Sequence, residues 1–286
     1  MRDLNIIRDD NTQVYKKILF ERPISRLHAR RIGLLAGKHA SLKKVSDAYQ
    51  IISALNHDLT IVAEEELKEH NVPAGVYLHG SKKASQPYVN SDEALYSLEN
   101  CNYVVTGMDI EISSRLQIFL EKFILSRNAP IIFSTDSIAL FKISPELLNN
   151  RRGDIFVCNT KSLIDLAKYI KVPIEFKVQD GILNKLNLLK RLSQKLQAHI
   201  ICIEDYQILS SSFTDTDKAG VVNIKNPQNL SIDYLYIPIL TSLLCDVPNP
   251  EIDMLDRILT AGYLLCTILT GENEFVQNLK SVIKQD

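Results

Sequence analysis

Polar side chains that could transfer a proton or bind a ligand follow several predicted strands. Asp136 follows the apolar run Pro130–Thr135, and Asn159 ends the next predicted strand. Asp233 stands at a predicted helix start, where the helix dipole favours an acidic residue in any case. In a parallel sheet, ligands bind beyond the carboxyl ends of the strands. Each residue alone also has a structural explanation, so only their joint arrangement can indicate a site.

A second candidate is the turn after the strand predicted at Arg31–Gly37. The pattern of Gly33, Gly37 and Lys38 is similar to that of a phosphate-binding loop. However, the spacing is one residue short, and His39 stands in place of Ser or Thr. We interpret the segment as a strand-to-helix turn with an exposed lysine. The chain has 10 glycines in 286 residues, about half the usual share, which leaves few for a backbone cradle around phosphate.

Composition excludes several classes of protein. A formal net charge of -1 gives no general attraction for nucleic acid or an acidic membrane, and no partner of either kind is expected. The charged start is unlike a secretory signal, and no apolar run reaches the ~20 residues of a membrane span. The 5 cysteines are widely spaced, which favours reduced thiols, no zinc site and a cytoplasmic location.

Alternating elements would position the candidate residues. Short apolar runs predict strands at Arg31–Gly37, Leu59–Ala63, Gly75–His79, Tyr103–Thr106, Pro130–Thr135 and Ile155–Asn159. A period near 3.6 predicts helices at Ser41–Leu55, Ile112–Leu125 and Lys161–Ile170, the last with Thr160 as N-cap. Such alternation indicates a parallel sheet with right-handed crossovers.

The pattern changes after Val172. A helix near Leu183–Leu196 precedes a strand at His199–Ile203, and a polar turn separates antiparallel strands at Gln207–Ser211 and Val221–Lys225. Apolar helices are expected near Ile232–Leu244, Met254–Thr270 and Glu274–Ile283. Because no linker interrupts the series, we predict a single domain over residues 1–286, with residues 1–22 as an N-terminal extension.

From about Pro23 to Gly271, the order and spacing of these segments resemble a ribokinase-like family, the ADP/ATP-dependent NAD(P)H-hydrate dehydratases, historically grouped with carbohydrate kinases. Ala36-Gly37-Lys38 stands where that family has a Gly-Gly-Ser turn. Val104–Asp109 stands at its Gly-Pro-Gly turn, of which Gly107 remains. The resemblance implies a three-layer α/β fold with a mostly parallel central sheet and helices on both faces.

Other family motifs are altered. Asp136, within Ser134–Phe141, falls on the second aspartate of an Asp-Ala-Asp-Ala-Leu segment. By position, Asn159 replaces a histidine, and Glu204 reverses the charge of a lysine. Residues 230–233 replace a Gly-Thr-Gly-Asp turn, keeping the aspartate and losing both glycines.

The resemblance implies that Asp233 is the catalytic acid or base, with ADP or ATP and Mg²⁺ as cofactor. It also implies cofactor contacts from Gly107, Asn159, Glu204, Asn226 and Ser231, and substrate contacts from Gly37, Lys38 and Asp136. Bulky residues in the 230–233 turn and the negative charge of Glu204 would weaken or abolish binding of the phosphates.

Three functions therefore stay open. The first is a nucleotide-dependent hydro-lyase or small-molecule kinase acting on a nucleotide or a small phosphorylated metabolite. The second is a catalytically inactive relative that serves as a binding or assembly module. The third is a different small molecule, without phosphate, in the same cleft. We also expect a homo-oligomer, although the apolar C-terminal helices could equally belong to the core.

Overall fold

The computed structural model describes residues 5–8, 29–69, 74–82, 87–149, 151–174, 181–204, 207–214, 218–224, 233–245 and 253–269. The strands in this part of the chain are β1 Asn5–Arg8, β2 Arg31–Ala36, β3 Asp58–Glu64, β4 Val76–Leu78, β5 Tyr103–Met108, β6 Ile131–Phe133, β7 Ile155–Cys158, β8 His199–Glu204, β9 Gln207–Ser211 and β10 Lys218–Asn223. The helices are α2 Leu42–Ala54, α3 Ser91–Glu99, α4 Ser114–Ser126, α5 Leu140–Ile143, α6 Thr160–Tyr169, α7 Ile182–Leu196, α8 Asp233–Cys245 and α9 Met254–Leu269.

All these strands belong to one ten-stranded sheet, in the order β1-β10-β9-β8-β7-β6-β5-β2-β3-β4. Neighbouring strands run parallel except for β9, which is antiparallel to both β8 and β10. The consecutive βαβ crossovers therefore bring the carboxyl ends of β2 and of β5 to β8 to the same edge of the sheet.

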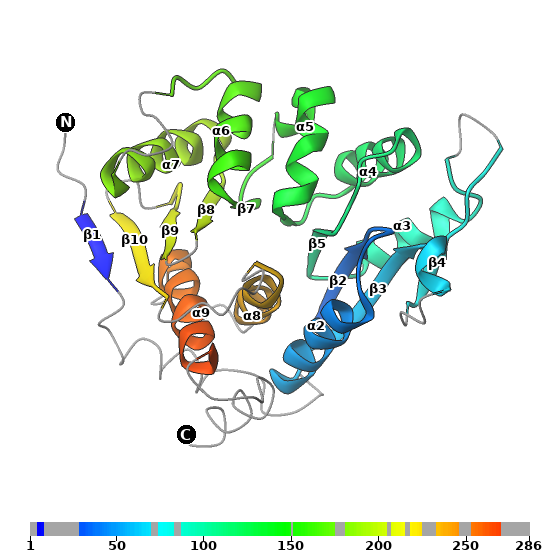
Figure 1. Cartoon of the computed structure of the whole chain (residues 1–286). Helices are drawn as coiled ribbons and strands as arrows, with labels where there is room; N and C mark the ends of the chain where they lie inside the picture. The colour runs from blue at the N-terminus through cyan, green and yellow to red at the C-terminus, as the bar shows by residue number, and fades with distance from the viewer. Residues whose placement is uncertain are drawn as a thin grey trace.

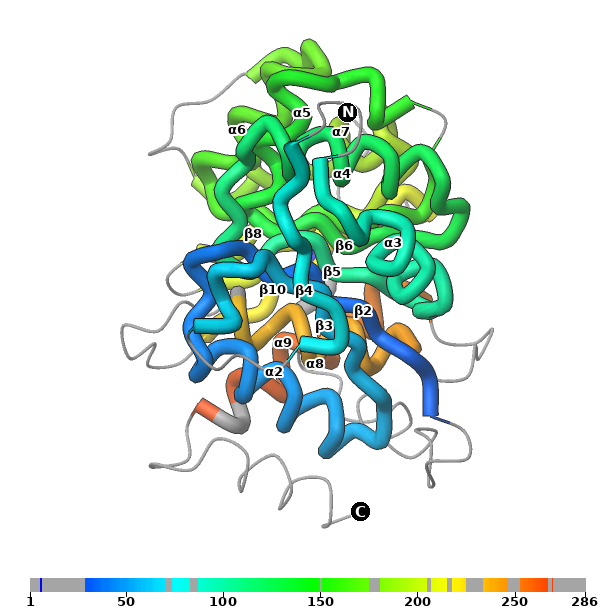
Figure 2. Tube along the Cα trace, turned by 90° about the vertical axis from the view of Figure 1, so that its right-hand side faces the viewer, coloured from blue at the N-terminus to red at the C-terminus, as the bar shows by residue number. Residues whose placement is uncertain are grey.

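Helices cover both faces of the sheet (Figures 1 and 2). Helices α3 to α7 lie on one face, and α2, α8 and α9 lie on the other. Each face has its own apolar core, one centred on α8 with the fully buried Tyr236, the other containing Phe119, Phe123 and Phe133. The predicted three-layer architecture with a mostly parallel sheet is confirmed.

The strands near the centre of the sheet begin and end close to their predicted limits, and the differences lie elsewhere. Residues 5–8, within the expected N-terminal extension, add an edge strand that pairs in parallel with β10. Helix α3 was not predicted. Strand β10 begins at Lys218, so residues 218–220 belong to a strand and not to the polar turn. The helix expected at Glu274–Ile283 lies outside the described residues, and the extent of the domain stays a prediction.

The N-cap of α6 also differs from the prediction. The cap is Asn159 and not Thr160, which is the first helical residue. The Asn159 Oδ1 accepts the Ser162 backbone N–H at 2.8 Å, and the Ser162 Oγ accepts the Asn159 backbone N–H at 2.9 Å. This reciprocal pair satisfies two backbone donors at the start of the helix. Asn159 is therefore the N-cap in place of the neighbouring threonine.

All five cysteines are free thiols, and four of them are buried. Burial raises the pKa of the Cys202 thiol to about 12 and that of Cys158 well above its usual value. Among the residues that the structure describes, none of the helices combines the length and the apolar character needed to cross a bilayer.

Candidate ligand-binding site

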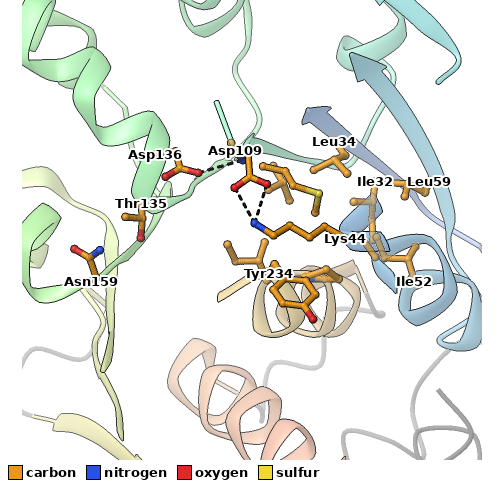
Figure 3. A pocket seen from close by; sticks show the side chains of 16 residues that line it. Ile32, Leu34, Lys44, Ile52, Leu59, Asp109, Thr135, Asp136, Asn159 and Tyr234 are labelled. Carbon is orange, nitrogen blue, oxygen red and sulfur yellow. Dashed lines mark hydrogen bonds and ion pairs between the residues drawn. The ribbon is translucent and has the colours of Figure 1, made fainter. Parts of the chain in front are cut away.

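A cavity of about 200 Å³ lies where the carboxyl ends of β5, β6 and β7 meet helices α2 and α8 (Figure 3). Its walls are formed by Ile32, Leu34, Lys44, Ala48, Ile52, Leu59, Val105, Gly107, Met108, Asp109, Thr135, Asp136, Asn159, Tyr234, Ile237 and Pro238. Apolar side chains and a few convergent polar groups together are the usual form of a small-molecule site, and this cavity has both.

Three of the predicted site residues line this cavity. Gly107 lies near the end of β5, Asp136 follows β6, and Asn159 follows β7. They come from three separate segments that are neighbours only because β5, β6 and β7 are adjacent in the sheet. The fold thus places close together in space three residues that the sequence alone had assigned to a site.

The turn at the end of β5 requires glycine at its first position. Gly107 has a φ of 109°, and a Cβ there would lie 2.0 Å from the Oγ of Ser134. Asp109 also has a left-handed backbone, with a φ of 53°, which aspartate tolerates better than most residues. Its backbone N–H donates to the Oδ2 of Asp136 at 3.1 Å. This bond joins the turn after β5 to the segment after β6.

Gly37 holds the same turn from the other side. A Cβ on Gly37 would lie 2.4 Å from the carbonyl oxygen of Asp109, and the Gly37 N–H donates to the carbonyl of Met108 at 3.0 Å. Gly37 does not line the cavity. Its observed role is to let the β2–α2 turn pack directly on the turn that carries Asp109.

Lys38 is not among the residues that line the cavity. Its Nζ lies 2.6 Å from the Oε2 of Glu111, and its backbone N–H donates to the Oε2 of Glu64 at 2.9 Å. Glu64 is buried and also accepts a hydrogen bond from the hydroxyl of Tyr88 at 3.3 Å. Burial raises the pKa of the Glu64 carboxyl. The sequence predicted an exposed lysine at a strand-to-helix turn, and the Lys38 side chain at this turn is 36% exposed.

Glu204 does not line the cavity, and its charge is offset. It accepts hydrogen bonds from the Nζ of Lys185 at 2.6 Å and from the Oγ1 of Thr160. The sequence-based argument treated the replacement of a lysine by Glu204 as an added repulsive charge. The structure corrects that argument, because Lys185 restores a positive charge beside the carboxylate.

The remaining predicted residues can be placed only in part. Helix α8 begins at Asp233, and the next residue, Tyr234, lines the cavity. The backbone of Asp233 is therefore adjacent to the site. Asn226 and Ser231 lie outside the described residues, as does the rest of the turn in which glycines are replaced.

The sequence-based prediction missed the most prominent polar contact of the cavity, between Lys44 on α2 and Asp109. The Lys44 Nζ lies 2.8 Å from both carboxylate oxygens of Asp109 and 5.8 Å from the centre of the Tyr234 ring (Figure 3). The two side chains are 27% and 28% exposed. The sequence did contain one indication that Asp109 has a role of its own. It occupies the third position of the turn, where the family has a second glycine.

In the described part of the chain, no group of three or more His, Cys, Asp or Glu side chains could hold a metal ion. The Mg²⁺ that accompanies a nucleotide needs only one or two protein carboxylates beside the phosphate oxygens. Asp136 is a carboxylate at the cavity wall, whereas that of Asp109 is paired with Lys44, so the residues present fit that mode of binding and not a dedicated metal centre.

Several solved structures share this architecture over nearly the whole chain. A ribokinase-like superfamily protein from Enterococcus faecalis is 14% identical with a TM-score of 0.71, and the match covers 98% of this chain and 95% of that one. A hypothetical protein from Streptococcus mutans is 12% identical with a TM-score of 0.69, covering 98% and 99%. An ADP/ATP-dependent NAD(P)H-hydrate dehydratase from Bacillus subtilis, co-crystallized with ATP/Mg²⁺, is 13% identical with a TM-score of 0.58, covering 95% of each chain.

No protein-family model and no curated protein sequence matches the chain. At these identities the structural matches establish the fold and not the activity. The chain has the ribokinase-like fold, and the resemblance found in the sequence is confirmed at that level.

Proposed function

Starting from the ribokinase-like fold, we propose that the cavity binds a small organic molecule and that the chain acts, together with ADP or ATP, on a nucleotide or a small phosphorylated metabolite. The reaction would be that of a hydro-lyase or a small-molecule kinase. The observation that carries this proposal is the convergence of Gly107, Asp136 and Asn159 on one cavity. The family resemblance assigns the same three residues to ligand binding on the basis of the sequence alone.

In this proposal each polar residue has a distinct part. Asp233, at the start of α8 and next to a cavity residue, would take up or release the proton. The Oδ1 of Asn159 already accepts the Ser162 N–H, which leaves its amide NH₂ group to donate to a ligand. Gly107 would let the ligand approach the backbone at the end of β5. Mg²⁺ would supply charge neutralisation of the phosphates, held in part by Asp136.

A thermal-shift titration with ADP and ATP, each with and without Mg²⁺, tests the proposal. A ligand that binds only the native state raises the melting temperature by mass action, so we expect a rise that depends on Mg²⁺. Asp136→Asn should reduce it, whereas Asp92→Asn, at an exposed ion pair with Lys122 on the opposite face, should not. Wild-type protein that shows no shift at millimolar nucleotide would rule out the nucleotide-dependent function.

One observation favours a second candidate, a catalytically inactive relative that binds a ligand without transferring phosphate. Asp109 places a side chain, ion-paired with Lys44, at the turn where the family has glycine. Glycine lets a ligand come close to the backbone, and a larger side chain at that position leaves less room for a phosphate. This candidate predicts that Asp233→Asn leaves the biological function intact. A measured turnover that is abolished by Asp233→Asn would contradict it.

Two further expectations remain proposals. We propose that the chain is a homo-oligomer, because apolar side chains such as Tyr96 and Leu125 are exposed on α3 and α4. We also propose a cytoplasmic location, because all five cysteines are free thiols. Light scattering after size exclusion and fractionation of cells measure the two directly.

A further inference from the structure

The Lys44–Asp109 ion pair lies between two chemically different parts of the cavity. On one side of it are Thr135, Asp136 and Asn159, and on the other are the apolar side chains of Ile32, Leu34, Ile52 and Leu59 (Figure 3). The strand order supports this division, because β7 and β6 lie on one side of β5 and β2 and β3 on the other. We call the two parts the polar compartment and the apolar compartment.

We propose that the apolar compartment binds a flat, apolar ring carrying an anionic group, and that this group binds Lys44 in place of Asp109. The inference rests on the cavity of the proposed function and specifies the class of its ligand. Asp109 is then an internal competitor for Lys44, which holds the lysine until an anion of the right shape arrives.

The backbone of Asp109 is fixed, whereas its carboxylate, among the residues that the structure describes, bonds to Lys44 alone. Gly37 packs against the Asp109 carbonyl, and the Asp109 N–H is bonded to Asp136. Rotation of the Asp109 side chain therefore needs no movement of the turn. Both carboxylate oxygens of Asp109 bond to the same ammonium group, that of Lys44. A single side-chain rotation would therefore release Lys44 to bind another anion.

Lys44 is suited to such an exchange. Its ammonium has three donors on a flexible stem, and its aliphatic part extends along the apolar compartment (Figure 3). The exchange keeps the ammonium paired, so the ligand does not have to offset an isolated charge in a cleft. Burial of the ring against Ile32, Leu34 and Leu59, beside the Tyr234 ring, would then supply the net gain in affinity.

The opposing interpretation is that the ion pair only ties α2 to the end of β5. Both interpretations predict the same structure without ligand, but they differ in what removal of the Asp109 charge does. If the pair is only a tie, Asp109→Asn lowers stability and changes no affinity. If Asp109 competes with a ligand, the same substitution increases the affinity for anions alone.

Isothermal titration calorimetry with 2-naphthoate and 2-naphthamide separates these cases, because the two probes have the same shape and differ in charge. We expect wild-type protein to bind both weakly. In Asp109→Asn the dissociation constant for 2-naphthoate should fall by about tenfold, with that for 2-naphthamide changed by less than about twofold. In Lys44→Met the preference for the anion should disappear, and in Lys44→Arg it should persist.

Lys122→Met, at an exposed ion pair outside the cavity, serves as the matched control and should behave as wild type. Circular dichroism and thermal melts establish that each variant is folded. If Asp109→Asn binds 2-naphthoate no more tightly than wild type does, or if Lys44→Met keeps the preference for the anion, the inference is overturned. The same holds if neither probe binds any variant at millimolar concentration.

These titrations contain no nucleotide, so their outcome is separate from that of the proposed function. A nucleotide titration without a thermal shift, together with Asp109-dependent binding of 2-naphthoate, would remove the nucleotide-dependent function and leave the ligand class in place. The reverse result would keep the nucleotide site and discard the role of Lys44.

Discussion

The parallel strands begin at one edge of the sheet, the amino edge, and end at the other, the carboxyl edge. Both edges carry buried or half-buried charges, but the partners of these charges differ. At the amino ends of the strands, Arg127 donates to the backbone carbonyls of Leu98, Cys101 and Asn102, and Arg151 binds Asp154. At the carboxyl ends, Lys44 and Asp109 meet at the wall of a cavity. Arg127 and Asp154 are only 4% and 3% exposed, against 27% and 28% for the side chains of Lys44 and Asp109.

The difference shows why charge alone does not identify a site. Arg127 binds backbone carbonyl oxygens, which no ligand could displace. Arg151 binds backbone carbonyl oxygens as well as the Asp154 carboxylate, and that carboxylate is also held by the Ile131 N–H. The lysine at the carboxyl edge binds one side chain that can rotate away. A site therefore combines a charged group, a cavity beside it and a partner that can be exchanged. Arg127 and Arg151 have no such exchangeable partner in the contacts given above.

The substitution with the largest expected effect on stability removes a charge at the amino edge. Arg151→Met leaves the buried carboxylate of Asp154 without its cation, although the Ile131 N–H still donates to it. Breaking a buried pair from one side typically costs about 3–5 kcal/mol of unfolding free energy. Urea denaturation should show a loss in this range. Arg152→Met, at the exposed neighbouring position, should change stability by less than about 0.5 kcal/mol, and an equal loss in both variants would contradict the assignment.

The second test uses pH at the same edge. His199 at the start of β8 is buried, and burial lowers its pKa from 6.5 to about 4. A depressed folded-state pKa means that the stabilising contribution is complete above pH 6.5 and is lost as the pH falls toward 4. The shift corresponds to at most about 3 kcal/mol.

Unfolding free energies measured between pH 7 and 4 check this expectation. The wild-type curve should fall more steeply than that of His199→Gln. Replacement of the exposed His39 by Gln should leave the wild-type slope unchanged. Parallel curves for wild type and His199→Gln would show that the imidazole is not buried in its neutral form.

The third test strains the turn that carries Asp109. Gly107→Ala must adopt a φ that side chains rarely reach and must displace the Oγ of Ser134, so we expect a loss of about 2 kcal/mol. Gly181→Ala, where a Cβ meets no atom within 4 Å, is the matched control. The loss should be accompanied by weaker binding of 2-naphthoate, because Lys44 and Asp109 depend on this turn. Unchanged stability would mean that the turn can adopt another conformation.

The smallest expected effect on stability is that of Lys44→Met. The pair is about one quarter exposed, so its removal should cost only about 1 kcal/mol or less of unfolding free energy. The same substitution should remove the preference for anionic probes. At the carboxyl edge, loss of a charge should therefore change binding strongly and stability little, whereas at the amino edge it should change stability strongly. A loss as large as that of Arg151→Met would place Lys44 among the structural cations.

Sequence patterns predicted the central strands well, because buried parallel strands are short, apolar and bounded by polar turns. They missed β1, since the four residues Asn5–Arg8 carry little local signal and are ordered by pairing with β10. The cap of α6 was misassigned to Thr160 because threonine and asparagine are both good N-caps. The Asn159-x-x-Ser162 spacing of the reciprocal cap was nevertheless visible in the chain.

The site was predictable where its residues follow strands and not where it depends on contacts between elements. Asp136 and Asn159 could be found because each ends an apolar run. The Lys44–Asp109 pair could not, because the altered turn singles out Asp109 but does not indicate that Lys44 on α2 is its partner. The charge of Glu204 was misjudged for the same reason, since its partner Lys185 lies on α7, a separate element.

The pairing of β1 with β10 also affects the order in which the protein can be completed on the ribosome. The chain emerges from its amino terminus, so residues 5–8 are exposed long before their partners Lys218–Val221 exist. Contacts so distant along the chain form late because their loop-closure entropy has to be overcome first. Residues 5–8 are thus synthesised well before the strand with which they pair, and a bulky group attached next to them would hinder this late step more than the folding of the central strands.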